Sequence, residues 1–224
     1  MTTVTGRTLD ENGDPIPGTG FEYEEDGLIA DLLAQRVGPL NSHPTRPTWG
    51  TPLERPDEGH DRVCILSIFG PGFEGPPEHY HEVSVETFDV RQGTVTFTAD
   101  DSDYTVTAGE TLVVETGTRH TFNCPGDELT VVVTTIAPLG RIGYVLSTLS
   151  GIAHDPTVDA DDPLQRALIA KRLHGDTVFT EAESGVRRVA TDVLAPLAKL
   201  RGYQGGYGRY RQDAFWERHV EQPV

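Results

Sequence analysis

The stretch that decides the fold is HYHEVSVETFDVRQG, residues 79–93. Side chains alternate between the two faces of a strand, so His79 and His81 point to one face while Tyr80 points away. A second alternating run follows, in which Glu86 lies on the same face as the apolar residues. We therefore expect Glu86 to join the two histidines on an inward face.

Short apolar or alternating runs continue on both sides of this stretch. Gln92-Gly93 predicts a tight turn, because glycine reaches the positive φ that such a turn needs. Further strands are expected at residues 63–69, 94–98, 104–107, 111–115 and 129–136. Short strands at this spacing are typical of a sandwich or barrel, so we predict a mainly β fold.

Two motifs in this region resemble those of a known superfamily. The first, Gly-x3-His-x-His-x4-Glu-x6-Gly, runs from Gly75 to Gly93, and the second, Gly-x7-Gly-x2-His-x2-Asn, runs from Gly109 to Asn123. Together they resemble the signature motifs of the cupin superfamily, over about residues 60–138. The resemblance implies a cupin jelly-roll barrel that holds a divalent metal through His79, His81, Glu86 and His120.

The match departs from the usual pattern at three positions. The first glycine lies nearer the histidines, Glu115 stands where proline is common, and Asn123 comes one residue early. None of these departures removes a ligand. The alternatives are that the histidines are ordinary polar positions on a half-exposed sheet, or that the fold has lost its metal. Four ligand residues at the right spacing favour a metal site.

The ligand set narrows the choice of metal. Three imidazoles and one carboxylate suit divalent Fe, Mn, Ni, Cu, Co or Zn, and ligand type alone does not choose among them. Magnesium and calcium prefer oxygen ligands and are disfavoured. Such an ion can keep positions open for substrate, water or dioxygen, which makes catalysis plausible. Glu86 is the candidate catalytic residue, since it could also leave the metal to act as a base.

The chain is strongly acidic and contains very little lysine. It has 35 acidic residues against 18 basic ones, for a net charge of −17, and its only lysines are Lys171 and Lys199. Such a composition predicts adaptation to high intracellular salt, which screens the self-repulsion, and we expect a halophilic source. The alternative is an acidic mesophilic protein. The charge argues against binding to nucleic acid.

The sequence predicts a cytoplasmic protein that does not enter a membrane. It contains no apolar run of about 18 residues, the length that a membrane-spanning helix needs, and its amino terminus lacks the apolar region of a signal peptide. Two cysteines, Cys64 and Cys124, cannot build a disulfide framework, and we expect both to be reduced.

We divide the chain into an N-terminal arm (1–59), a cupin β-barrel core (60–138) and a helical C-terminal extension (139–224). Residues 27–37 predict a short helix. Residues 44–56 contain four prolines and Trp49 and predict an extended arm lying over another surface, with the barrel of a neighbouring subunit as the candidate. In many cupins this segment crosses to a partner, so the resemblance implies a homodimer. The alternative is a mobile leader.

The period of the apolar residues changes after the barrel. Runs at helical spacing within residues 142–152, 163–173 and 186–197 predict three helices, and Asp161-Asp162 provides an amino-terminal cap before Pro163. These helices are expected to pack outside the sheet, close a barrel mouth or form a dimer contact. Residues 202–211 are rich in tyrosine and arginine, as in some RNA-binding segments. Given the acidic background, we interpret them as a connector whose tyrosines pack against the body.

Two classes of function follow. The favoured one is a metal-dependent enzyme acting on a small neutral or aromatic molecule, and a centre of three histidines and one glutamate resembles that of quercetinase-type dioxygenases. The inward strand positions are expected to be mostly Val, Phe and Thr, with Arg91 pointing outward, which does not suit a phosphorylated substrate. The alternatives are a non-redox isomerase, lyase or hydrolase, and a non-enzymatic protein that binds a small ligand at its metal.

Overall fold

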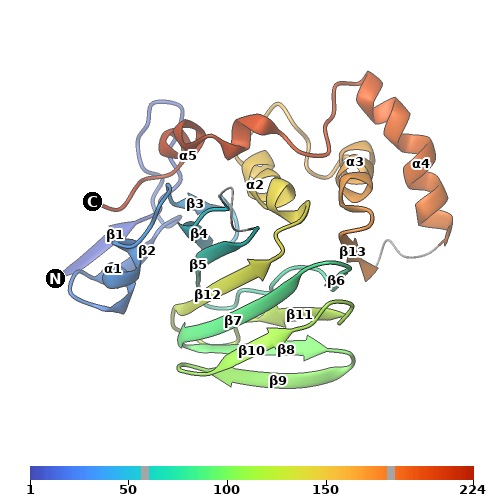
Figure 1. Cartoon of the computed structure of the whole chain (residues 1–224). Coiled ribbons are helices and arrows are strands. Elements are labelled where there is room, and N and C mark those ends of the chain that lie inside the picture. The colour runs from blue at the N-terminus through green and yellow to red at the C-terminus, as the bar shows by residue number, and fades with distance from the viewer. Residues whose placement is uncertain (57–60, 181–184) are drawn as a thin grey trace.

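The structure is a computed structural model that describes residues 1–56, 61–180 and 185–224, without the side chains of 185–191. Two antiparallel sheets form its centre (Figure 1). The six-stranded sheet has the order β10-β7-β12-β5-β4-β3, with β3 Asn41–Ser42, β4 Thr48–Glu54, β5 Val63–Phe69, β7 Val85–Gln92, β10 Thr111–Val114 and β12 Thr130–Ala137. The five-stranded sheet has the order β13-β6-β11-β8-β9, with β6 His79–His81, β8 Thr94–Ala99, β9 Ser102–Thr107, β11 His120–Asn123 and β13 Thr177–Phe179.

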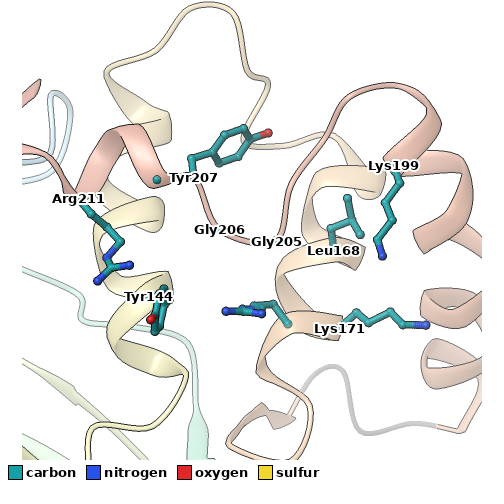
Figure 2. Close-up of a pocket in the computed structure, with 10 residues that line it drawn as sticks. Tyr144, Leu168, Lys171, Lys199, Gly205, Gly206, Tyr207 and Arg211 are labelled. Atoms are coloured by element: carbon teal, nitrogen blue, oxygen red, sulfur yellow. The ribbon is translucent and has the colours of Figure 1, made fainter. Parts of the chain in front are cut away.

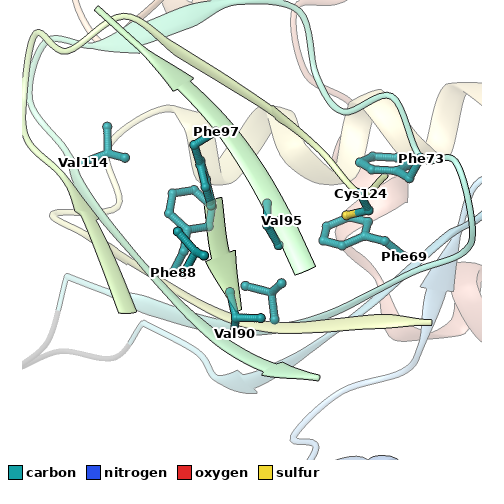
Figure 3. Close-up of a cluster of buried hydrophobic side chains, with 10 residues drawn as sticks. Phe69, Phe73, Phe88, Val90, Val95, Phe97, Val114 and Cys124 are labelled. Atoms are coloured by element: carbon teal, nitrogen blue, oxygen red, sulfur yellow. The ribbon is translucent and has the colours of Figure 1, made fainter. Parts of the chain in front are cut away.

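The main apolar core lies between these two sheets (Figure 3). Phe88 and Val90 of β7 face Val95 and Phe97 of β8, and each of the four is at most 5% exposed. Phe88 and Phe97 pack edge to face, with ring centroids 4.9 Å apart. Cross-sheet packing of this kind holds the two sheets together and confirms the mainly β prediction.

The threonines of β8 point away from the core. Along this strand Val95, Phe97 and Ala99 are buried, while Thr94, Thr96 and Thr98 are only partly buried. Because successive side chains alternate, the apolar residues take the inner face and leave the outer face to threonine. Inward threonines occur instead on β12, where Thr130 and Thr134 are buried opposite Phe69 and Phe88.

The prediction of an arm over residues 44–56 is wrong for most of that segment, because it forms a strand of the chain's own sheet. β4 pairs with β5 from Thr48 to Glu54. Trp49 is 5% exposed, packs 5.0 Å from the ring of Phe21 and donates its Nε1–H to the carbonyl of Gly6 at 2.9 Å. Burial of this indole against the chain's own N-terminal segment explains why the strand stays with its own sheet.

The N-terminal segment also contains a small sheet of β1 (Thr2–Thr5) and β2 (Phe21–Glu24), followed by α1 (Leu28–Leu33). The helix falls within the predicted residues 27–37. The expected boundary between the N-terminal arm and the core, at residues 59 and 60, lies outside the described residues.

All three helices predicted after the barrel are present, as α2 (Ile142–Ala153), α3 (Pro163–Leu173) and α4 (Gly185–Leu200). Asp162 caps α3 by accepting a hydrogen bond from the amide of Leu164 at 2.8 Å, as expected. The structure adds a 3-10 turn, η2 (Gly208–Arg211), and α5 (Asp213–His219). Among the described residues, no helix combines the length and apolar character that crossing a membrane requires.

The extension packs against the inner face of the six-stranded sheet, at the end where Ile136 lies opposite Glu86, and then returns to the N-terminus (Figure 1). Val63 and Ile136 of the sheet contact an apolar cluster that includes Tyr207 and Tyr210, which are 4% and 0% exposed. This burial confirms the interpretation of residues 202–211 as a connector. Arg7 and Glu221 then form an ion pair between the two ends of the chain.

Candidate metal centre

Four ligand-type side chains converge between the two sheets. His79 and His81 lie on β6 and His120 on β11, where it pairs directly with His79, whereas Glu86 comes from β7 of the other sheet. One nitrogen or oxygen atom of each lies within 4.8 Å of all the others. Two ligands on opposite sides of an ion lie about 4.2 Å apart at a bond length of about 2.1 Å. The cluster therefore has nearly the span of a metal site.

The cluster is shielded from solvent. The exposed fractions are 2% for His81, 1% for His120, 7% for Glu86 and 9% for His79. The Oε2 atom of Glu86 lies 3.1 Å from Nε2 of His120 and 3.4 Å from Nε2 of His81. A carboxylate buried to this extent needs a partner of positive charge, which a proton on histidine or a metal ion can provide.

The backbone fixes which ring nitrogen of two histidines faces the cluster. Nδ1 of His79 lies 2.9 Å from the carbonyl oxygen of Pro77, and Nδ1 of His120 lies 3.0 Å from that of Thr118. A carbonyl only accepts hydrogen bonds, so Nδ1 must carry a proton in both rings. Nε2 of each ring is thereby directed toward the centre of the cluster, as in metal-binding histidines.

A threonine hydroxyl orients the third ring. Nδ1 of His81 lies 2.8 Å from Oγ1 of Thr177, whose own hydroxyl donates to Asp176 at 3.0 Å. Oγ1 therefore accepts the Nδ1–H of His81. The Nε2 atom of His81 is buried and makes no hydrogen bond to any described residue. An unsatisfied buried nitrogen aimed at three other ligand atoms fits a bound metal ion, which would satisfy it.

The environment shifts the pKa values of the cluster in different directions. Burial by itself raises the pKa of Glu86, but the imidazoles of His120 and His81 outweigh it and hold this pKa well below its usual range. Burial lowers the pKa of His79 to about 4. Burial also lowers the pKa of His120, but its hydrogen bonds to Glu86 and to the carbonyl of Thr118, together with the nearby negative charges, outweigh that effect and raise the pKa. His79 is thus neutral at neutral pH and available as a ligand.

The sequence did not reveal the contribution of the C-terminal extension to this site. β13 pairs with β6 so that Thr177 lies opposite His81 and Phe179 opposite His79. The ring of Phe179 lies 5.8 Å from that of His79. The available signal was the β-type run Thr177-Val178-Phe179 after the second predicted helix, but three residues are too few for periodicity to identify a strand.

Asp176 links Thr177, the hydrogen-bond partner of His81, to the helical extension. Its carboxylate, in a residue that is 2% exposed, accepts hydrogen bonds from the backbone amides of Arg141 and Ile142 where α2 begins. A carboxylate at a helix amino terminus is stabilised by the exposed N–H groups and the helix dipole. The start of α2, Asp176, Thr177 and His81 therefore form one connected hydrogen-bonded chain.

A jelly-roll-type domain with three histidines and one glutamate gathered between its sheets has the arrangement expected of a metal-binding cupin. The family model of the Cupin domain matches residues 65–137. This part of the chain is a cupin domain.

Several solved structures are similar to part of the chain. KdgF from Halomonas sp. has 17% identity and a TM-score of 0.37, covering 41% of this chain and 81% of that one. A predicted oxalate decarboxylase from Thermotoga maritima has 19% identity and a TM-score of 0.38, covering 40% and 78%. A variant of Streptomyces PAC13 with uridine has 19% identity and a TM-score of 0.35, covering 42% and 70%. The comparison with curated proteins found no match.

Proposed function

We propose that this chain is a metal-dependent enzyme whose cupin domain binds one divalent transition-metal ion through His79, His81, Glu86 and His120. The observation that carries the proposal is the buried Nε2 atom of His81, which makes no hydrogen bond to a described residue although it lies in a cluster of four ligand-type residues. When bound, such an ion supplies Lewis acidity and, if it is redox-active, electron transfer with dioxygen. The protein's part is to orient the three imidazoles and exclude water.

The proposed reaction is the oxidation of a small neutral or aromatic molecule by dioxygen, as in a quercetinase-like dioxygenase. The groups that contact the three histidines from outside the cluster are neutral. They are two backbone carbonyls, the hydroxyl of Thr177 and the ring of Phe179. A phosphorylated substrate would instead need cationic side chains. Arg91 does not supply one, because it is exposed on β7 and lies 3.6 Å from Asp89 of the same strand.

Glu86 is the proposed catalytic residue. Its low pKa keeps it ionised, so it can bind the metal or accept a proton from the substrate when a ligand position is exchanged. The same ligands would also serve a non-redox isomerase, lyase or hydrolase, or a binding protein without turnover. Metal content, oxygen uptake and the loss of Glu86 separate these alternatives.

The first experiment is elemental analysis of protein purified in molar salt without added metal, with oxygen uptake measured on catechols, flavonols and diketones. Iron, copper, manganese or nickel together with oxygen uptake is the expected result. Zinc without uptake would favour the non-redox reactions. A protein that contains no metal and binds none when it is added would contradict the proposal.

The second experiment replaces Glu86 by Gln, with Glu115→Gln as the matched control. Glu115 is exposed and follows β10, the strand that pairs with β7 around Glu86, so the control removes the same charge without touching the cluster. An enzyme should lose most of its rate in Glu86→Gln and keep it in the control. A ligand-binding protein without turnover would only bind its ligand and metal more weakly.

A further inference from the structure

The helical extension contains a cavity that shares no residue with the His/Glu cluster (Figure 2). Its volume is about 510 Å³. Its walls come from α2, α3, α4, η2 and the segment Gly205–Gly208 that crosses between them. Figure 2 shows Tyr144 and Arg211 on one side of this space, Lys171 and Lys199 on the other, and Gly205–Gly206 between the two. The volume lies within the range of about 300–1,000 Å³ that is usual for small-ligand sites.

The charge of this cavity is opposite to that of the whole molecule. Four of the ten lining residues are cationic, Lys171, Arg172, Lys199 and Arg211, and none is acidic. Acidic residues outnumber basic ones 35 to 18 in the chain, and both of its lysines line this one cavity. A concentration of positive charge on a protein of net charge −17 attracts anions locally.

Three of these four cations have no acidic partner among the described residues. Lys171 forms an ion pair with Asp192 at 2.9 Å. Within the described part of the chain, no carboxylate lies within ion-pair distance of Arg172, Lys199 or Arg211. In a chain with so many acidic residues, unpaired cations in one concave place indicate that their partner comes from outside the chain.

Two of the cations share one aromatic ring. The guanidinium carbon of Arg211 lies 4.1 Å from the ring centroid of Tyr144, and that of Arg172 lies 5.3 Å from it. The ring attracts both guanidinium groups, but their like charges repel each other. An anion bound between them would remove this repulsion and accept paired hydrogen bonds from the planar guanidinium groups.

The glycine segment brings the backbone close to these cations. A Cβ atom on Gly205 would lie 2.6 Å from the carbonyl oxygen of Leu168, so only glycine allows this approach to α3. Neither Gly205 nor Gly206 donates its amide hydrogen to another described residue. Free amides next to arginine and lysine are a combination suited to phosphate oxygens, which accept several hydrogen bonds at once.

We infer that this cavity binds a small phosphorylated molecule, with Arg172 and Arg211 holding the phosphate beside Tyr144 and Lys199 contributing from the opposite wall. The size of the cavity suits a ligand up to that of a nucleotide. RNA is disfavoured because the rest of the surface is strongly acidic. This site does not depend on the metal centre, and the two proposals stand or fall separately.

The test is calorimetric titration of the full-length protein with inorganic pyrophosphate, before and after dialysis against a chelator. The dialysed sample excludes binding of pyrophosphate to a metal ion. We expect saturable binding of one pyrophosphate per chain in both samples, weakened at least about tenfold in Arg172→Gln/Arg211→Gln. The matched control is Arg91→Gln/Arg218→Gln, which removes the same charge from two exposed arginines outside the cavity and should bind within about twofold of the natural protein.

Three results would overturn the inference. The first is no saturable binding of pyrophosphate, or an affinity that falls equally in both double variants. Equal loss would mean that binding depends only on overall charge. The second is citrate binding as tightly as pyrophosphate, which would make the site a general anion site. The third is a single-stranded oligouridine that binds tightly and is not displaced by pyrophosphate, which would assign the surface to RNA. Unchanged thermal midpoints would establish that the variants are folded.

Discussion

A single hydroxyl supports the orientation of the candidate ligand His81. In Thr177→Val the shape of the side chain is kept, but the buried Nδ1–H of His81 loses its acceptor, at a cost of about 1–3 kcal/mol. Loss of a hydrogen bond that orients a ligand histidine lowers metal affinity by about 10- to 100-fold, and competition with a chromophoric chelator would measure this change. Thr177→Ser keeps the hydroxyl and should bind metal almost normally. Equal affinity in all three proteins would mean that the hydroxyl does not position the ring.

Protons compete with metal at the same cluster. Histidine binds metal only when neutral, and although burial opposes it, the hydrogen bond to Glu86 raises the pKa of His120 above its ordinary value of 6.5. Metal affinity should therefore rise with pH through this pKa, with proton release that calorimetry in buffers of different ionisation enthalpy would detect. An affinity independent of pH between about 6 and 8, where histidine normally titrates, would contradict this assignment.

The same shifts make opposite contributions to the stability of the metal-free protein. The raised pKa of His120 stabilises the fold below pH 6.5, and this contribution is lost as pH rises through the folded-state pKa. The lowered pKa of His79 stabilises above 6.5, and that contribution is lost as pH falls from 6.5 toward about 4. We expect the free energy of unfolding of the metal-free protein, measured with denaturant, to fall as pH falls from 6.5 toward about 4. In His79→Gln this fall should be smaller.

At the level of elements, Gly75 sets how closely the chain before β6 approaches β11. Its φ is +76°, and a Cβ atom there would lie 1.6 Å from the carbonyl oxygen of Phe122. Gly72 has a similar φ of +70° but nothing within 4 Å, so it is a matched control. Gly72→Ala should cost about 1–2 kcal/mol in the free energy of unfolding from its backbone conformation alone. Gly75→Ala should cost clearly more in urea unfolding, because β11 must move; equal costs would contradict this.

The strands of the cupin core were predictable because their apolar and polar residues alternate. β5 was predicted with the bounds it has, Val63–Phe69, and the inward phase of Glu86 followed from the period of β7. β4 was not recognised, since Pro52 and the surrounding prolines suggested an extended arm. A proline can occupy a strand at a bulge, and the register of β4 shifts between Pro52 and Glu54.

The candidate ligands were predictable, but their supporting residues were not. Spacing within one motif was enough to group His79, His81 and Glu86, and His120 came from the second motif. Thr177 lies 96 residues from His81, and its hydrogen bond depends on how α2 and α3 pack against the sheet. No local pattern encodes that packing, because it arises from apolar contacts between segments distant in sequence.

For the whole molecule, the net charge of −17 predicts that stability depends on salt. Like charges repel over a Debye length of about 10 Å at 0.1 M salt but only about 3 Å at 1 M, so added NaCl should raise the thermal midpoint. A triple variant, Glu22→Gln/Asp26→Asn/Glu128→Gln, removes three exposed negative charges and should show a smaller rise, which distinguishes screening from other effects of salt. A rise that continues to about 1 M would support adaptation to high salt, whereas a plateau near about 0.1 M would indicate an ordinary acidic protein. A midpoint that falls with salt would contradict both interpretations of the composition.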